Sequence, residues 1–229
     1  MSSHTILHPS VQAVSHGQIQ VIFGPMFSGK TTELMRRMKR YQIANQKCMI
    51  IKYAKDVRYD TSGIATHDKQ VLSAWPTENL TDLYSEACKH DVIGIDEGQF
   101  YPEIVSFCDK LAELGKVVIV AALDGTFQKK GFGDILNLVP IAESVIKLNA
   151  VCMSCFGEGS FTKRKGSEKK VEVIGGAEMY LATCRGCFHS PAKSRSPLKS
   201  INTNTVIDSN VKNATKNLFA KDIKNICIQ

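Results

Sequence analysis

The sequence has no long apolar run. None approaches the roughly 20 consecutive apolar residues that a membrane-spanning helix needs. Residues 1–16 also lack the continuous apolar core of a signal peptide, because His4, His8 and Gln12 interrupt them. We therefore expect a cytoplasmic protein without a membrane partner, in which residues 1–16 form a disordered N-terminal arm.

The first two-thirds of the chain have no net charge. Residues 1–150 contain 16 Lys and Arg and 16 Asp and Glu, whereas residues 151–229 contain 13 and 6. The formal net charge of +7 therefore belongs to the last third. Such an excess fits nucleic acid, a solvated tail or pairing with an anionic substrate. Because charge runs are more often solvated than functional, we expect no nucleic-acid partner.

A phosphate-binding motif is the most informative stretch of the chain. In such a loop the backbone N–H groups face phosphate oxygens, Lys30 reaches the β- and γ-phosphates, and the Thr31 hydroxyl binds Mg²⁺. A predicted strand precedes the motif and a predicted helix follows it, so the anion would sit at a helix N-terminus. A chance glycine-rich turn is the alternative. The motif, a full match to G-x-x-x-x-G-K-[ST], consists of Gly24, Pro25, Met26, Phe27, Ser28, Gly29, Lys30 and Thr31.

A second motif supplies two adjacent carboxylates. Residues 92–95 are apolar, and Asp96 and Glu97 follow them directly. This pattern is typical of a Walker B motif, in which Asp96 binds Mg²⁺ directly or through water. Glu97 should then take a proton from the attacking oxygen, which contributes ~10²–10⁴-fold in rate. Attack by water would make the protein an ATPase, and attack by a substrate hydroxyl would make it a kinase. The alternative is that Asp96 and Glu97 are an acidic pair on the surface with no function.

Strand and helix patterns alternate over residues 17–149. Near-continuous apolar strands joined by helices predict an α/β fold with a doubly wound parallel sheet, here a P-loop nucleotide-binding domain. The polar residues 55–70 are expected to form a mobile loop. Strands are predicted at residues 18–23, 48–53, 91–96 and 116–122, and helices from Thr31, at 80–89 and from Pro102 to a stop at Gly115.

Two cysteine pairs follow this region. The spacing Cys152-x-x-Cys155 and Cys184-x-x-Cys187 presents four thiolates tetrahedrally, which suits Zn²⁺. A site closed by four cysteines has no open position for catalysis, so we expect a structural zinc. Two disulfides, disfavoured in the cytosol, or a redox-active pair are the alternatives. His189 is a nominal substitute ligand.

Residues 150–190 are predicted to form a small zinc-bound lasso that acts as a lid over a second substrate and excludes water. Within it, residues 171–176 are predicted to be a strand whose backbone hydrogen-bonds a nucleobase. Phe100, Phe127 and Phe132 are candidate walls for a flat ligand, although each alone is more often a core residue. Residues 191–229, rich in Ser, Asn and Lys, are predicted to be a disordered basic tail.

Together these motifs resemble those of the cytosolic, zinc-containing (type II) thymidine kinases. The resemblance rests on residues 24–31, 95–100, 122–127 and 171–176 together with the four cysteines, and it covers about residues 17–190. The vertebrate members of this family carry a degradation signal of the Lys-Glu-Asn type near the C-terminus. No such signal occurs in this sequence.

The resemblance implies that ATP and Mg²⁺ phosphorylate the 5′-hydroxyl of thymidine, with Glu97 as general base. It adds Asp56, Arg58 and Gln99 to the groups around the donor phosphates. It further implies a homotetramer that thymidine triphosphate inhibits by feedback. The residues that it assigns to the nucleoside are Met26, Phe100, Leu123, Phe127, Phe132, Thr162, Val171, Glu172, Val173, Ile174, Gly175 and Tyr180.

A nucleic-acid-dependent ATPase with a zinc module is the main rival. The basic tail and the basic run that begins at Arg36 would fit it. The chain is, however, too short for the second motor domain that such machines usually carry, and the basic run reads as the solvated face of an amphipathic helix. A non-catalytic zinc module would leave the phosphate-binding motif unexplained. The sequence therefore favours a kinase.

Overall fold

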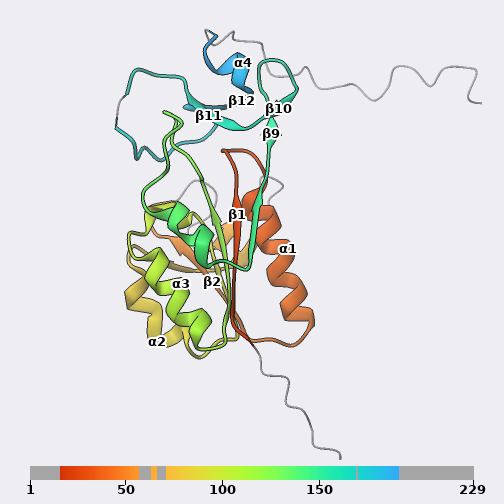
Figure 1. The fold of residues 1–229 in the computed structure, drawn as a ribbon, viewed down its shortest axis with the longest axis vertical. Helices are drawn as coiled ribbons and strands as arrows, with labels where there is room; N and C mark the ends of the chain where they lie inside the picture. The colour runs from red at the N-terminus through yellow and green to blue at the C-terminus, as the bar shows by residue number, and fades with distance from the viewer. Residues whose placement is uncertain (1–15, 57–62, 66–70, 169, 191–229) are drawn as a thin grey trace, which may run out of the picture. The chain divides into compact units, whose positions relative to one another are not determined.

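A six-stranded parallel sheet forms the centre of the fold (Figure 1). The computed structural model describes residues 16–56, 63–65, 71–168 and 170–190. The strands stand in the order β5–β2–β6–β7–β1–β8, and all neighbouring pairs run parallel. Their bounds are β1 Gln18–Phe23, β2 Cys48–Tyr53, β5 Trp75–Thr77, β6 Val92–Ile95, β7 Val117–Ala122 and β8 Ser144–Lys147.

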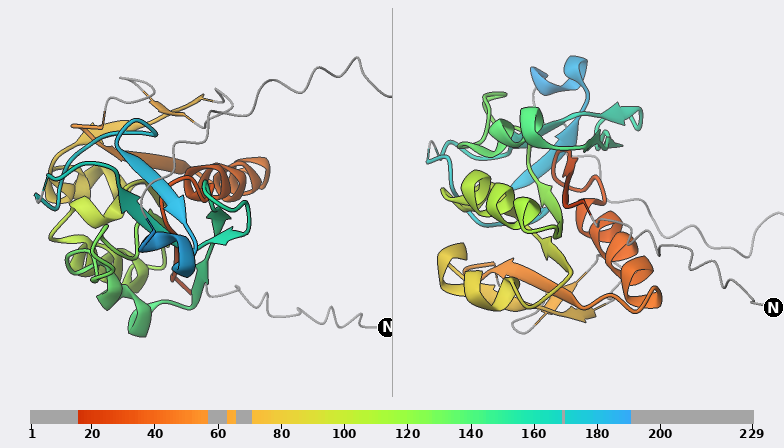
Figure 2. Two further views of the ribbon diagram at one scale, coloured as in Figure 1. Left: turned by 90° about the horizontal axis from the view of Figure 1, so that it is seen from above. Right: turned by 60° about the horizontal axis from the view of Figure 1, so that its bottom comes forward.

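Helices cover both faces of the sheet (Figures 1 and 2). Alternate residues of a strand enter different cores: Val21 of β1 packs on the side of α3, whereas Ile22 packs with Leu34 of α1. Because both faces are apolar, the strands are near-continuous hydrophobic runs, and the predicted α/β fold is confirmed. The helices up to β8 are α1 Lys30–Ile43, the 3₁₀ helix η1 Leu80–Leu83, α2 Tyr84–Ala87, the 3₁₀ helix η2 Gly98–Phe100, α3 Ile104–Glu113 and the 3₁₀ helix η3 Ile135–Ile141.

The carboxyl ends of three neighbouring strands place the sequence motifs at one edge of the sheet. The phosphate-binding loop follows β1, Asp96 and Glu97 follow β6, and Leu123 follows β7. Strand β7 lies between β6 and β1, so the three loops are neighbours. Ligands of open parallel sheets bind outside this edge.

Two stretches before β6 differ from the sequence prediction. The helix predicted at 80–89 is split into η1 and α2. The segment 55–70, predicted as a loop, contains β3 (Gly63–Ala65), which pairs antiparallel with β4 (Val71–Ser73). Three-residue strands are too short to show a periodicity in the sequence.

The segment that follows β8 forms two small antiparallel ribbons and a short helix, seen at the top of Figure 1. β9 pairs with β10, and β11 pairs with β12. Their bounds are β9 Ala150–Val151, β10 Glu158–Gly159, β11 Phe161–Arg164, β12 Tyr180–Thr183 and α4 Arg185–Phe188.

The strand predicted at residues 171–176 is not formed, and this prediction is wrong. No strand of the described residues pairs with it. Its carbonyl groups bond side chains instead: the Arg164 guanidinium donates to the carbonyl of Val171 (3.0 Å), and the Tyr180 hydroxyl donates to that of Val173 (2.6 Å). The apolar residues of this segment therefore do not belong to a sheet, and the segment forms a wall against the rest of the protein.

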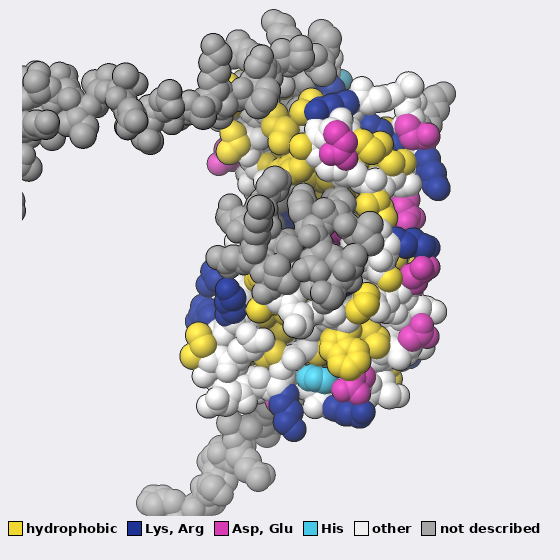
Figure 3. Space-filling model, turned by 180° about the vertical axis from the view of Figure 1, so that it is seen from behind, with side chains coloured by type: hydrophobic (Ala, Val, Ile, Leu, Met, Phe, Trp, Pro, Cys, Tyr) yellow, Lys and Arg dark blue, Asp and Glu magenta, His cyan; other side chains and the backbone are white. Residues whose placement is uncertain are grey.

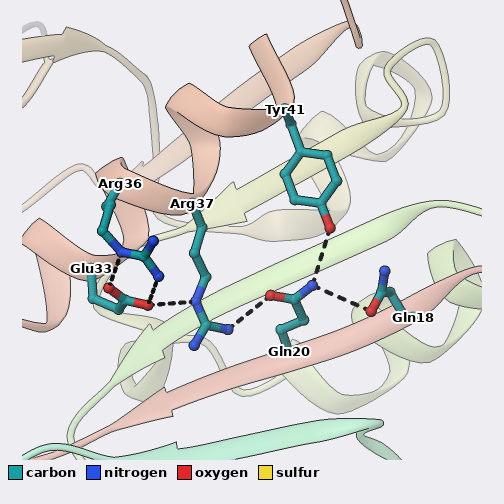
Figure 4. A network of polar contacts seen from close by, with 6 residues as sticks. All are labelled: Gln18, Gln20, Glu33, Arg36, Arg37 and Tyr41. Carbon is teal, nitrogen blue, oxygen red and sulfur yellow. Dashed lines mark hydrogen bonds and ion pairs between the residues drawn. The ribbon is translucent and has the colours of Figure 1, made fainter. Parts of the chain in front are cut away.

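The basic run of α1 anchors the helix to the sheet (Figure 4). The Glu33 carboxylate accepts hydrogen bonds from Arg36 (2.6 Å) and Arg37 (2.8 Å), and these pairs lower the pKa of Glu33 to about 2 against the opposing effect of burial. Arg37 also donates to Gln20 of β1 (2.8 Å), whose amide donates to Tyr41 (3.2 Å). The prediction of a solvated face holds for Arg36, whose side chain is 55% exposed, but not for Arg37 at 14%.

Charges of both signs are interspersed on the face shown in Figure 3 rather than gathered into a basic stripe. No helix within the described ranges is long and apolar enough to span a bilayer. The disordered arm predicted at residues 1–16, apart from His16, and the tail predicted at 191–229 lie outside those ranges.

Candidate active site

The phosphate-binding loop wraps the N-terminus of α1. Gly29 is the N-cap of the helix and has a φ of 81°, a conformation that glycine adopts at little cost. At Gly24 a Cβ would lie 2.7 Å from the backbone oxygen of Leu148 and 2.5 Å from the Ser28 Oγ, so only glycine fits there. Lys30 Nζ and Ser28 Oγ each donate to the carbonyl of Pro25 at 2.9 Å. The loop is therefore closed on itself, with its lysine beside the helix N-terminus.

Thr31 and Asp96 bring two oxygen donors together. The Thr31 hydroxyl donates to Asp96 Oδ2 at 3.1 Å. Asp96 is only 8% exposed, and burial, followed by the adjacent Glu97 charge, raises the pKa of Asp96 to about 7. A cation beside these oxygens would stabilise the ionised carboxylate and so lower the pKa of Asp96. A carboxylate together with a hydroxyl is a ligand set typical of Mg²⁺.

Glu97 stands in a strained turn at the end of β6. Its φ of 54° and ψ of 40° are left-handed, which costs a non-glycine residue about 1–3 kcal/mol. Gln99 donates to the Glu97 carboxylate at 2.6 Å and accepts the backbone N–H of Leu123 at 2.9 Å. The carboxylate is thus oriented by an amide that is itself fixed on the end of β7. Strain of this kind is concentrated at functional sites.

A cavity of about 410 Å³ opens above this edge of the sheet. This volume is in the range of small-molecule sites. Phe27, Gly29, Lys30, Thr31 and Glu97 line one part of it. All twelve residues that the family resemblance assigns to the nucleoside line the cavity as well, namely Met26, Phe100, Leu123, Phe127, Phe132, Thr162, Val171, Glu172, Val173, Ile174, Gly175 and Tyr180.

The remaining predicted phosphate ligands lie apart from the lining. Gly24, Pro25 and Ser28 build the loop behind it, and Asp96 and Gln99 support Thr31 and Glu97 from below the surface. Asp56 sits in the turn after β2, where its N–H donates to the Tyr53 carbonyl (3.0 Å), and it does not line the cavity. Arg58 lies outside the described residues.

The phenylalanines have two roles at once. Phe100 stacks on Tyr53 with ring centroids 4.8 Å apart and meets Phe132 edge-on at 5.6 Å. Both Phe100 and Phe132 pack against the main core while lining the cavity. For Phe100 and Phe132 the choice between core and ligand wall therefore has no single answer, because the core ends at this wall. Phe127 lines the cavity, where the Arg164 guanidinium lies over its ring.

One hydrogen bond joins the phosphate-binding loop to the ribbon β11–β12. The Met26 N–H donates to the Thr162 hydroxyl at 3.0 Å, and both residues are buried. The two sides of the cavity are thus in direct contact at its floor.

Sequence reasoning missed five of the lining residues: Thr32, Gly125, Thr126, Met153 and Arg164. Arg164 is the most unusual, since it is an arginine with only 7% exposure. It stands inside a basic run, which reads as solvated surface. The signal that could have found it is the period-two pattern of β11, in which Thr162 and Arg164 share the buried face.

The four cysteines form one cluster beside the cavity. The sulfur atoms of Cys152, Cys155, Cys184 and Cys187 all lie within 4.8 Å of one another. Those of Cys155 and Cys184 are 3.7 Å apart, and Zn–S bonds of ~2.3 Å in a tetrahedron require about 3.8 Å. Cys184 caps α4 and accepts the Cys187 N–H at 3.4 Å.

Two thiols of the cluster have pKa values shifted in opposite directions. Although burial opposes ionisation, the N–H groups around Cys152 lower the pKa of its thiol to about 6, whereas hydrogen bonds from Cys184 and the other thiols raise the pKa of Cys187 to about 12. None of the seven cysteines within the described ranges forms a disulfide. His189 is outside the cluster and contacts Lys129 Nζ at 3.1 Å. The four thiols therefore have the donor set and the spacing to hold zinc.

Comparison with known proteins identifies the family. The family model described as thymidine kinase matches residues 17–188. The chain belongs to the thymidine kinase family. It is 62% identical over 182 residues to cytosolic thymidine kinase of Gallus gallus, covering 80% of this chain and 81% of that protein. Identity is 60% to the human cytosolic enzyme, with 82% and 80% covered, and 58% to thymidine kinase of Vaccinia virus (strain Ankara), with 75% and 97% covered.

Membership of the thymidine kinase family makes the chain a phosphotransferase of the type II class, and the family resemblance drawn from its motifs is confirmed. The matched residues include the phosphate-binding loop, the acid pair and all four cysteines. Every part of the cavity wall described above is thus inside the matched region.

Proposed function

We propose that the protein transfers the γ-phosphoryl group of ATP to the 5′-hydroxyl of thymidine, giving thymidine monophosphate for nucleotide salvage in the cytoplasm. The observation that carries this proposal is that one cavity contains both kinds of lining. It joins Lys30, Thr31 and Glu97 to an aromatic and apolar wall large enough for a nucleoside. Phosphoryl transfer needs positioning and charge stabilisation above all, and this arrangement provides both.

Mg²⁺ would be held by Thr31 and Asp96, and it would neutralise charge on the β- and γ-phosphates. Lys30, at the start of α1, would add its positive charge on the same side. The helix dipole and the N–H groups of the loop favour the triphosphate over water.

Glu97 would accept the proton of the 5′-hydroxyl as the oxygen attacks phosphorus. Gln99 holds the carboxylate at 2.6 Å and so fixes its direction. The donor role that the family resemblance gives to Gln99 is then indirect: its amide acts through Glu97 rather than on phosphate. Asp56 and Arg58 stay proposed donor-side residues.

The thymine ring would lie between Phe127 and the segment 171–175, hydrogen-bonded largely by backbone groups. Met26, Leu123, Thr162 and Tyr180 would surround the 5-methyl group. One methyl contributes only ~1–3 kcal/mol, so preference over deoxyuridine should be modest.

A structural zinc would tie the two ends of the lasso, residues 150–190, to each other next to the nucleotide-binding domain, residues 17–149. It would keep the lid closed over the acceptor and so limit hydrolysis of ATP. With all four thiols bound, the zinc would have no open coordination position, which fits a structural role.

We also propose a homotetramer that is inhibited by thymidine triphosphate. Exposed apolar side chains at Leu136, Val139 and Val145 give η3 and β8 a surface suited to contact with another subunit. Thymidine triphosphate carries the base that fits the wall and the phosphates that fit the loop, so it can fill both parts of the cavity.

Transfer of labelled γ-phosphate from ATP tests the proposed reaction. We expect labelled thymidine monophosphate, slower labelling of deoxyuridine and little of deoxycytidine, with no stimulation by DNA. Release of inorganic phosphate that depends on DNA, without any labelled nucleotide, would instead favour the ATPase.

A further inference from the structure

We propose that Arg164 is a positioning residue for the acceptor side of the cavity. Its guanidinium holds residues 170–173 in the conformation that makes residues 171–173 part of the cavity wall. The inference rests on the proposed function only for the identity of the acceptor, thymidine. It assigns a task to a residue that the phosphate chemistry does not use.

The guanidinium of Arg164 binds three carbonyl groups of one segment. Nη1 donates to the carbonyls of Glu168 (3.1 Å) and Lys170, and Nη2 donates to that of Val171 (3.0 Å). Nη2 also donates to the Tyr180 hydroxyl at 2.6 Å. Three of the four N–H bonds of this planar, always-charged group therefore go to a stretch that has no partner strand among the described residues, and the fourth goes to β12.

Tyr180 extends this anchor to a fourth carbonyl. Its hydroxyl accepts from Arg164 and donates to the carbonyl of Val173 at 2.6 Å. Such relays strengthen each member, because a polarised hydroxyl is a better donor. Arg164, directly and through Tyr180, thus does for residues 170–173 what a β-ladder does for a strand.

The flat face of the guanidinium fixes a second wall. It lies over the Phe127 ring at 3.9 Å from the centroid. Phe127 belongs to a tight turn in which Gly125 and Gly131 are bridged and the Thr126 N–H donates to the Lys130 carbonyl at 2.8 Å. Arg164 therefore joins three lining elements: this turn, β12 and residues 171–173.

The geometry requires arginine rather than positive charge alone. The ammonium of a lysine is a single point with no planar face, so it cannot reach three carbonyls and a hydroxyl and also stack on an aromatic ring. Arg164→Lys should keep the charge and lose the anchor. The neighbouring Lys165 is exposed, does not line the cavity and donates to the Ala177 carbonyl. Lys165→Ala is therefore a matched control.

Steady-state kinetics of full-length, zinc-loaded protein test the proposal. For Arg164→Lys we expect the KM for thymidine to rise about 10- to 100-fold, with kcat and the KM for ATP changed less than about threefold. Lys165→Ala should leave all three values within about twofold. An unchanged KM for thymidine, whether or not kcat falls, would overturn the positioning role.

Hydrogen exchange of the amides gives a readout that does not need a substrate. In Arg164→Lys without ligands, the amides of residues 170–175 should exchange at least about tenfold faster, while those of α1 and α3 stay as in the parent protein. If the parent protein fails to phosphorylate thymidine, the proposed acceptor is wrong, but this exchange pattern still tests the anchor. Equal exchange in the two proteins would contradict it.

A milder variant covers the case in which Arg164→Lys does not fold. Tyr180→Phe removes the hydroxyl that links Arg164 to the Val173 carbonyl and leaves the other three guanidinium bonds in place. We expect faster exchange confined to residues near Val173. No change in exchange there would count against the relay and against the anchor.

Discussion

Glu97→Gln is expected to lower kcat about 10²- to 10⁴-fold while the affinity for thymidine changes less than about threefold. The amide has nearly the same shape as the carboxylate but cannot accept the proton of the attacking hydroxyl. Gln99, which donates to Glu97 at 2.6 Å, can still bond the amide oxygen, so the geometry of the turn should persist. Single-turnover rates and calorimetric titration with thymidine measure the two quantities separately.

Glu172→Gln is the matched comparison for this prediction. Glu172 is the other carboxylate that lines the cavity, and it accepts from the Tyr53 hydroxyl at 3.3 Å. A change there should appear in the KM for thymidine rather than in kcat. Near-normal turnover of Glu97→Gln, together with a large loss of kcat in Glu172→Gln, would assign the base to Glu172.

Cys152→Ser is expected to lose the zinc and nearly all activity. Structural zinc contributes ~10–16 kcal/mol of apparent binding free energy in small zinc peptides, which is comparable to the whole stability of a typical domain, about 5–15 kcal/mol. The two ribbons β9–β10 and β11–β12 have few core residues of their own, so they should lose their structure without the metal. We expect about one zinc per chain in the parent protein and less than about one-tenth in the variant, with thymidine phosphorylation below about 1%.

Metal analysis after dialysis, combined with the transfer assay, checks this prediction. Cys48→Ser is the control, because Cys48 lies on β2 outside the cluster and should leave the zinc content unchanged. A parent protein with no zinc and full activity would show that the four thiols act without metal.

The motifs of the donor side could be predicted from the sequence because they are local. A phosphate-binding loop needs its glycines and its lysine at fixed offsets in the sequence. Asp96 and Glu97 directly after an apolar run likewise mark the carboxyl end of a strand, and so the edge of the sheet where they lie. The strands at 18–23 and 48–53 carry strong patterns and keep their predicted bounds.

The acceptor side was harder to predict because long-range side-chain contacts determine it. Residues 171–176 have the apolar pattern of a strand, but Arg164 and Tyr180 take up their carbonyl groups. Arg164 itself is hidden in a basic run, as is Arg37 of α1, whose partner Gln20 lies on β1. Nothing local in the sequence shows that a charged side chain has such a partner.

One binding measurement tests most directly whether donor phosphates and acceptor share the cavity. The ligand is adenosine joined to thymidine, 5′ to 5′, through four or five phosphates. We expect one molecule to bind per chain, at least about 100-fold more tightly than thymidine alone, because the second half binds at an effective concentration in the millimolar range. It should exclude both ATP and thymidine. Binding no tighter than that of thymidine alone, or a complex that still admits free thymidine, would contradict a shared cavity.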